Sequence, residues 1–154
     1  DYQSPAILYI CGGNSLDNSY VQDLIDWRHK QGYVVYAVPE FDVGGSSAST
    51  SEIKNYILNA FETWQNPPEI VGLIGDTDGS YSLPYYEHNW GGYEGATDFN
   101  YTQLDGSDLI PEIFIGRISG GSSDVSTIIN KTIRYEKANS FGQTDEWFGR
   151  AALS

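Results

Sequence analysis

Apolar and polar positions along this chain alternate in blocks that predict strands and helices in turn. Four short apolar runs, rich in β-branched or aromatic residues, predict buried strands at residues 6–11, 33–38, 70–74 and 112–115. Turn-forming residues bound them, with Gly12-Gly13-Asn14 after the first run and Pro39 after the second. The strands are short and separated by longer segments, as expected where each segment connects two strands of the same sheet.

Three helices are predicted between and after these strands. The first covers residues 19–31 and has Gly32 placed as its C-cap, and the third covers residues 123–137. The second begins with a capping box made by Ser49 and Glu52 and ends before Asn66-Pro67-Pro68. Its apolar residues recur at the spacing of one helix face: Ile53, Tyr56, Ile57, Ala60, Phe61 and Trp64.

Strands that alternate with helices imply βαβ units, parallel strands and right-handed crossovers. We therefore expect an α/β fold of three layers, in which a parallel four-stranded sheet is flanked by helices in a Rossmann- or flavodoxin-like way. Residues 1–149 form one α/β subdomain in this interpretation. Residues 150–154 (RAALS) predict the start of the first strand of a following subdomain, so we expect the chain to be part of a longer polypeptide.

The charge of the chain is strongly negative. Against 21 acidic residues stand 8 basic ones, giving a net charge of −13 and a pI near 4.2. Such a chain repels phosphate backbones and anionic lipid surfaces, so nucleic acid is excluded as a partner class. No apolar run is long enough to span a bilayer, and we expect no membrane insertion. The acidic composition has two explanations. It keeps the protein soluble, or some of the carboxylates cluster to bind a hard cation such as calcium.

The chain has one cysteine, Cys11, which excludes an internal disulfide and a thiolate zinc cluster. A nucleophilic Cys11 would need a nearby base, and His29 and His88 are the two histidines available. A buried structural thiol is the favoured interpretation, and no catalytic residue is predicted. The glycines after Cys11 lack the complete phosphate-binding pattern, which argues against a nucleotide site.

Residues 40–47 and 75–110 are predicted to be irregular, and the second segment is long enough to suggest a functional loop. Asp76-x-Asp78-Gly79 begins like an EF-hand loop, but Tyr81 stands where that loop needs glycine, so an EF-hand is rejected. Asp98, Asp105 and Asp108 surround a glycine-containing turn and are the predicted ligands of a structural calcium ion. An Asx-rich turn that bonds its own backbone is the alternative.

Two further features of this region are singled out. Arg117 ends a predicted strand in Gly-Arg, and we expect its guanidinium to pair bidentately with a carboxylate of the acidic loop. The aromatic residues Tyr85, Tyr86, Trp90 and Tyr93 suggest a stacking or partner surface, with a self-packed loop core as the other interpretation.

Several segments in order resemble the N-terminal subdomain of the gingipain-like cysteine peptidases. Residues 97–117 (TDFNYTQLDGSDLIPEIFIGR) carry the resemblance best. Residues 69–76 (EIVGLIGD) resemble that family's strand ending in Gly-Asp, with a following proline at Pro84. Residues 132–136 (TIRYE) and Trp147 resemble the helix and tryptophan that precede the catalytic subdomain. Asp26-Trp27 and Lys30-Gln31-Gly32 resemble the family's first helix and the glycine after it. Each piece is short, but all occur in the family's order along nearly the whole chain.

The resemblance implies a caspase-like peptidase with two α/β subdomains side by side, of which the second carries a histidine base and a cysteine nucleophile. Neither of those positions falls in this chain. The expected function is therefore that of a non-catalytic N-terminal subdomain of a secreted gingipain-like cysteine endopeptidase. Its expected partners are the catalytic subdomain of the same polypeptide and, for the whole enzyme, protein or peptide substrates. The family's acidic loops in this region are also associated with structural calcium.

A different class of function remains open on the same residues. The chain could instead be a stand-alone extracellular module that binds glycan or protein through its tyrosines and tryptophan on a flavodoxin-like sheet. The polar-aromatic composition is typical of extracellular bacterial proteins, so both hypotheses place the chain outside the cell or at the cell surface.

Overall fold

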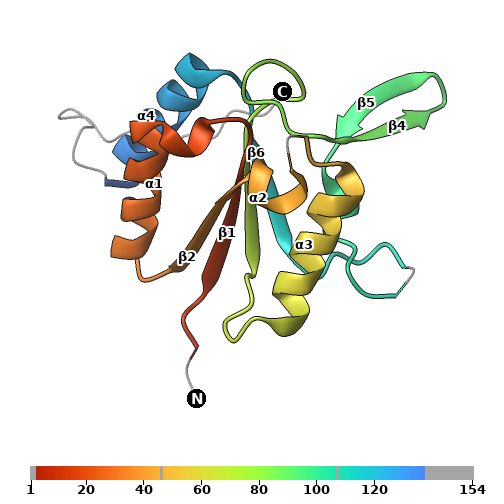
Figure 1. Ribbon diagram of the computed structural model, residues 1–154, viewed down its shortest axis with the longest axis horizontal. Coiled ribbons are helices and arrows are strands. Elements are labelled where there is room, and N and C mark those ends of the chain that lie inside the picture. Colours follow the sequence, from red (N-terminus) through yellow and green to blue (C-terminus); the bar gives the residue numbers. More distant parts are fainter. Residues whose placement is uncertain (1–2, 46, 107, 138–154) are drawn as a thin grey trace, which may run out of the picture.

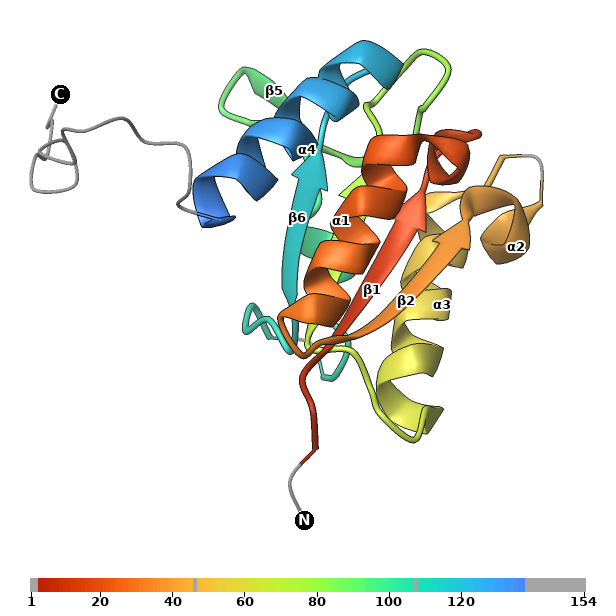
Figure 2. The same ribbon diagram turned by 90° about the vertical axis from the view of Figure 1, so that its left-hand side faces the viewer.

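The computed structural model describes residues 3–45, 47–106 and 108–137. Four parallel strands form a central sheet, with helices on both faces (Figures 1 and 2). The sheet consists of β1 (Ala6–Cys11), β2 (Val34–Pro39), β3 (Ile70–Ile74) and β6 (Phe114–Ile118). The main helices are α1 (Ser19–Lys30), α3 (Thr50–Thr63) and α4 (Ser122–Lys137). Shorter elements are α2 (Glu40–Gly44), the 3₁₀ turns η1 (Ser15–Asp17) and η2 (Phe99–Tyr101), and the hairpin strands β4 (Tyr86–Trp90) and β5 (Tyr93–Thr97).

The strand order in the central sheet is β2-β1-β3-β6, with all neighbouring pairs parallel. This is the order of a flavodoxin-like sheet, in which the chain first winds to one side of β1 and then crosses to the other. The predicted α/β class with a parallel four-stranded sheet is confirmed. Because all four strands run the same way, their carboxyl ends and the loops that follow them gather at one edge of the sheet.

Alternate residues of β1 face opposite layers, which divides the core in two. Ile7 and Tyr9 pack with α1 and α4, while Leu8 and Ile10 pack with α3. Figure 2 shows α1 and α4 side by side over one face of the sheet, with α3 on the other. All six residues of β1 are buried, as expected for a central strand covered on both faces. Each fully buried Leu or Ile contributes about 1.5–3 kcal/mol to stability.

The helix ends follow the sequence closely. The Ser49 hydroxyl accepts a hydrogen bond from the Glu52 amide at 3.2 Å, and the Glu52 carboxylate accepts one from the Ser49 amide at 2.8 Å. This is the predicted capping box. Just after the end of α1, Gly32 has a φ of 94°, a conformation that glycine adopts without strain.

An ion pair joins α1 to α4 near their ends. Arg28 donates to both carboxylate oxygens of Glu136, at 2.6 and 2.9 Å. The same carboxylate also accepts from the Trp27 indole at 2.6 Å and from the Gln31 amide at 3.1 Å. The last turn of α4 is therefore held against α1 by four donor contacts on one carboxylate.

Three segments differ from the sequence-based expectation. The last strand of the sheet is Phe114–Ile118, not residues 112–115, because Glu112 bonds elsewhere. The Glu112 amide donates to the Thr102 carbonyl at 3.0 Å, and the Glu112 carboxylate accepts from the Leu104 amide at 2.6 Å. Residues 40–44 form the short helix α2 rather than part of a loop, and the Glu40 carboxylate accepts from the Ala48 amide at 3.0 Å.

The third difference is the antiparallel hairpin β4–β5 inside the segment predicted to be irregular. Its strands are joined by Gly91 and Gly92, whose φ values of 60° and 92° suit a tight two-residue turn. The alternation of apolar and polar residues is weak here, because both faces of the hairpin are largely exposed. Figure 1 shows the hairpin projecting away from the central sheet.

The predicted strand start at residues 150–154 and Trp147 lie outside the described residues, as does the predicted boundary at residue 149. Over the described ranges, no helix has the length and apolar character needed to cross a membrane.

Candidate functional site

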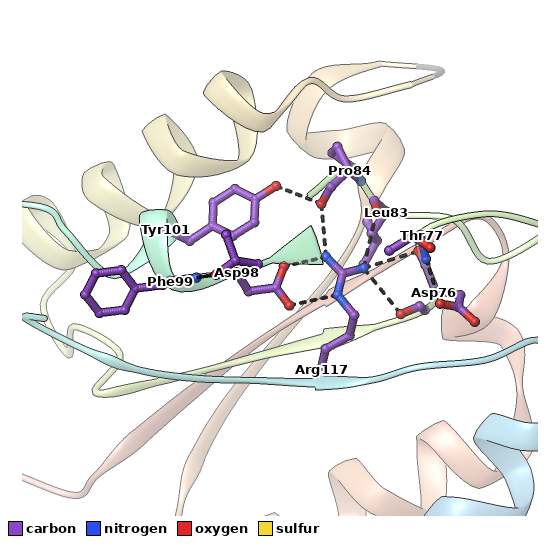
Figure 3. Close-up of polar contacts among 10 residues, drawn as sticks. Asp76, Thr77, Leu83, Pro84, Asp98, Phe99, Tyr101 and Arg117 are labelled. Atoms are coloured by element: carbon purple, nitrogen blue, oxygen red, sulfur yellow. Dashed lines mark hydrogen bonds and ion pairs between the residues drawn. The ribbon is translucent and has the colours of Figure 1, made fainter. Parts of the chain in front are cut away.

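The polar centre of the molecule is Arg117, at the carboxyl end of β6. Strand alternation points Arg117 to the same face as Ile113 and Ile115, toward α3 and the loops beside it. Its Nε and Nη2 atoms donate to the two carboxylate oxygens of Asp98 at 2.9 and 2.7 Å (Figure 3). The predicted bidentate pair between Arg117 and a carboxylate of the acidic loop is thus confirmed, and Asp98 is the partner.

The rest of the guanidinium binds backbone carbonyls of the loop that follows β3. These acceptors are Gly75 at 3.4 Å, Asp76 and Leu83 at 3.2 Å, and Pro84 at 3.0 Å. The Arg117 side chain is only 8% exposed and that of Asp98 19%. A desolvated charge of this kind is stable only when paired and fully hydrogen-bonded, as it is here. One side chain therefore ties β6 to both ends of the loop that leads into the hairpin.

Tyr101 supports the same carbonyl from the other side. Its hydroxyl donates to the Pro84 carbonyl at 2.8 Å (Figure 3). Its ring also packs edge-on against the Tyr86 ring, at a centroid distance of 5.0 Å. Burial raises the pKa of the Tyr101 hydroxyl, so the group remains a neutral donor. Tyr101 and Arg117 together fix the point at which the hairpin leaves the body of the protein.

Glycines at this edge make room for the protein's own backbone. A side chain on Gly75 or Gly12 would collide with the Tyr81 carbonyl oxygen, and one on Gly13 would meet the Ser80 carbonyl. The turn after β1 therefore faces carbonyl oxygens, which repel an anion, rather than a free space lined by amides. This explains why a glycine-rich turn follows a strand here without the pattern of a phosphate site.

The Cys11 thiol is not placed for catalysis. It is fully buried in the core between the sheet and the α1/α4 layer, and burial raises the pKa of the thiol to about 12. His88 lies on the exposed strand β4 and His29 near the exposed end of α1. A thiol in this environment stays protonated near neutral pH and is a poor nucleophile. The predicted burial of Cys11 is confirmed.

The three aspartates predicted to bind calcium have separate roles in this geometry. The Asp98 carboxylate is engaged by Arg117, and the Asp108 carboxylate accepts from the Ile110 amide at 2.9 Å. Asp105 is exposed, and its amide donates to the Glu112 carboxylate at 3.3 Å. Within the described ranges, no three His, Cys, Asp or Glu side chains are grouped so as to hold a metal ion. This arrangement does not fit a ready-made calcium site, and calcium stays a prediction.

The four aromatic residues of the loop divide between core and surface. Tyr86 packs inward against Tyr101, whereas Trp90 and Tyr93 are each 86% exposed at the tip of the hairpin. A cavity of about 480 Å³ lies between the hairpin and the loop after β3, and Thr77, Tyr85, Glu87, Asn89 and Glu94 are among its lining residues. Trp90 and Tyr93 are therefore an exposed pair, while the self-packed core involves Tyr86 alone of the four.

Comparison with known proteins identifies the family. The model of peptidase family C25 matches residues 1–153, nearly the whole chain. This chain belongs to peptidase family C25. Gingipain R2 and gingipain R1 of Porphyromonas gingivalis are each 28% identical to it over 140 residues, which are 85% of this chain. They correspond to 17% and 12% of those relatives, so the chain spans about a sixth or less of their length.

Solved structures agree with the C25 assignment. The crystal structure of the Arg-specific cysteine proteinase gingipain R matches 86% of this chain with a TM-score of 0.69 and 25% identity, over 28% of its own length. Dimeric latent PorU from Porphyromonas gingivalis covers 98% of this chain with a TM-score of 0.66. At 17% identity the PorU likeness shows the fold alone. The resemblance to the gingipain N-terminal subdomain is confirmed.

Within this C25 chain, sequence reasoning found Arg117 but missed its partners in the loop. Those partners are backbone carbonyls, which carry no residue signature. The hairpin was also missed, although Gly91-Gly92 between two aromatic residues is a two-residue turn signal that could have revealed it.

Proposed function

We propose that this chain is the non-catalytic N-terminal subdomain of a secreted gingipain-like cysteine endopeptidase. The observation that carries the proposal is the match of a C25 peptidase model to a chain whose single cysteine is buried and protonated. A cysteine peptidase needs an accessible thiolate beside a base. The nucleophile and base would therefore come from a catalytic subdomain in the same, longer polypeptide.

The physical task of the subdomain would be to give that catalytic subdomain a rigid neighbour. Strand β6 supports this role, because it pairs with β3 on one side and, among the described residues, with no strand on the other. Phe114, at the start of β6, is 75% exposed, and the nearby Leu109 and Ile110 are 77% and 66% exposed. Exposed apolar side chains beside an open strand edge favour packing against another part of the protein. Protein substrates would be cleaved by the whole enzyme.

The test compares this chain with the longer polypeptide encoded by its source. Each is assayed for hydrolysis of a set of fluorogenic peptides, with and without Cys11→Ser. We expect no hydrolysis by the short chain, and hydrolysis by the longer one that iodoacetamide blocks and Cys11→Ser leaves unchanged. Peptidase activity of the short chain that depends on Cys11 would overturn the proposal, as would a longer polypeptide without thiol-dependent activity.

The exposure of Trp90 and Tyr93 supports a second candidate, a stand-alone extracellular module that binds glycan or protein. Under this alternative, the source polypeptide would end or pass into a linker shortly after this chain. Binding to a glycan array, abolished by Trp90→Ala and with no peptidase activity in the longer polypeptide, would favour the module over the endopeptidase.

A further inference from the structure

The β4–β5 hairpin is an unpartnered element. Its two strands pair with each other and, in the part of the chain that the structure describes, with no further strand, so both outer edges of the ribbon are open. A two-stranded ribbon alone is marginally stable in water, and addition of a third strand satisfies its free backbone groups. The anchoring of its base by Arg117 and Tyr101 holds this ribbon in a defined position.

The two faces of the ribbon differ in chemistry. Cross-strand partners share a face, so Trp90 and Tyr93, which are directly paired next to the turn, present their rings on one side. Glu87, Asn89 and Glu94 belong to the opposite side, where the Asn89 amide donates to the Glu94 carboxylate at 3.2 Å. The ribbon thus has an aromatic face and an acidic face, and Glu87, Asn89 and Glu94 line the cavity of about 480 Å³ together with His88.

The charge around the ribbon favours a positively charged partner. No Lys or Arg occurs between Lys54 and Arg117, and Arg117 itself is neutralised by Asp98. Asp76 and Asp78 flank Thr77, a lining residue of the cavity, in the sequence. Glu87 and Glu94 have no Lys or Arg nearby in sequence, although His88 follows Glu87 directly, and both carboxylates are exposed. A cationic partner would meet complementary charge on the acidic face and a cation–π or stacking surface on the aromatic face.

We propose that the β4–β5 hairpin is an exosite that binds an extended basic segment of the substrate polypeptide by strand addition. Side chains of an added strand alternate between the two faces of the ribbon. The segment recognised is therefore one in which Lys or Arg at every second position faces Glu87 and Glu94, with apolar residues between them facing Trp90 and Tyr93. That the bound segment belongs to a substrate rests on the proposed endopeptidase function. That the hairpin binds a basic segment does not.

Binding is tested first on this chain, without any hydrolysis. The probe is a fluorescein-labelled peptide of alternating lysine and valine, followed by fluorescence anisotropy. The matched peptides are one with glutamate in place of lysine and one with the same lysines and valines in two blocks. We expect saturable binding of the alternating basic peptide, and we expect added NaCl to weaken it. The block peptide should bind about tenfold more weakly, a difference of about 1.4 kcal/mol in binding free energy. Equal binding of the two basic peptides would overturn strand addition.

Variants of the hairpin separate the two faces. Glu87→Gln with Glu94→Gln keeps the side-chain shapes and an acceptor for Asn89, and Trp90→Ala with Tyr93→Ala removes the aromatic pair. We expect roughly tenfold or greater loss of affinity in each double variant. The charge control is Asp23→Asn with Glu62→Gln, which removes two exposed carboxylates from α1 and α3. A loss in this control as large as in the hairpin variants would reduce the effect to net charge and overturn the site.

The substrate as the source of the segment is tested in the longer polypeptide. We expect Glu87→Gln with Glu94→Gln to raise the KM for a protein substrate rich in alternating basic residues several-fold, with unchanged hydrolysis of a short fluorogenic peptide. Unchanged KM for both substrates, with peptide binding intact, would assign the hairpin to another partner and overturn the exosite. A longer polypeptide that hydrolyses nothing would remove the proposed function, while the binding result on the short chain would still stand or fall by itself.

Discussion

Arg117 shows how one residue can organise a loop that has no regular structure of its own. The guanidinium offers five planar donors, and six oxygens from Asp98 and four backbone carbonyls surround it. Lysine could not replace it, because an ammonium group has three donors and no planar fork to match the carboxylate. The pair stabilises the native state mainly through the large cost of leaving either charge buried alone.

We therefore expect Arg117→Ala to destabilise the protein by about 3–5 kcal/mol, since it leaves the Asp98 carboxylate without its partner. Arg117→Lys should recover only part of that loss. The measurement is urea denaturation followed by tryptophan fluorescence, with Lys131→Ala on the exposed face of α4 as the control. A midpoint for Arg117→Ala equal to that of the parent chain would contradict the role assigned to this ion pair.

At the scale of elements, the contact between α1 and α4 depends on Glu136. Partial burial raises the pKa of its carboxyl, but the donors Arg28, Trp27 and Gln31 outweigh that effect and the pKa is lowered overall. A carboxyl with a depressed native pKa stabilises the fold above its unfolded pKa and loses that contribution as the pH falls through the native value. The ion pair therefore holds α4 in place at neutral pH and releases it in acid.

Glu136→Gln should destabilise the protein by roughly 1–2 kcal/mol near neutral pH, because the ion pair with Arg28 is lost and an amide nitrogen, which cannot accept, replaces one carboxylate oxygen. The difference between variant and parent should shrink as the pH falls below about 4.5, the ordinary pKa of this group. Denaturation midpoints measured across that range check both statements. A difference that stays constant with pH would mean that the carboxylate charge is not what holds the helices together.

The whole molecule combines a rigid three-layer body with an acidic, projecting loop region. The sheet and its helices depend on burial from both faces. The segment from β3 to β6 adds Tyr81, Leu83 and Tyr101 to that core and is also held by the polar contacts centred on Arg117. With a net charge of −13 on the chain and no Lys or Arg between Lys54 and Arg117, this second region repels anions and attracts cations. Such a distribution suits a surface that meets cationic partners, and it is the setting of the calcium hypothesis.

Calcium at Asp98, Asp105 and Asp108 makes a prediction that the whole protein can test. An ion bound there would raise the melting temperature in CaCl2 more than in MgCl2 at equal ionic strength, by mass action on the native state. The shift should vanish in Asp105→Asn with Asp108→Asn and be reversed by EDTA. Equal melting temperatures in the two salts would contradict the calcium hypothesis and leave Asp98 with its role as the partner of Arg117.

Much of the body was predictable from local pattern. Strands at Ala6–Cys11 and Ile70–Ile74 and the capping box at Ser49 came directly from the sequence, because burial on both faces produces continuous apolar runs and caps have short-range signatures. The start of β6 was misplaced by two residues. Glu112 looks like part of the apolar run but bonds to a loop that is close only in space.

What the sequence determined by itself is the alternation of strands and helices, the parallel sheet and the acidic character of the region between β3 and β6. These follow from the spacing of side chains along the chain, which is local information. The tertiary structure decided which carboxylate Arg117 binds, and that Tyr86 turns inward while Trp90 and Tyr93 stay exposed. Each of those outcomes depends on groups far apart in sequence meeting in three dimensions, and backbone carbonyls that complete the Arg117 site leave no mark in the amino-acid sequence.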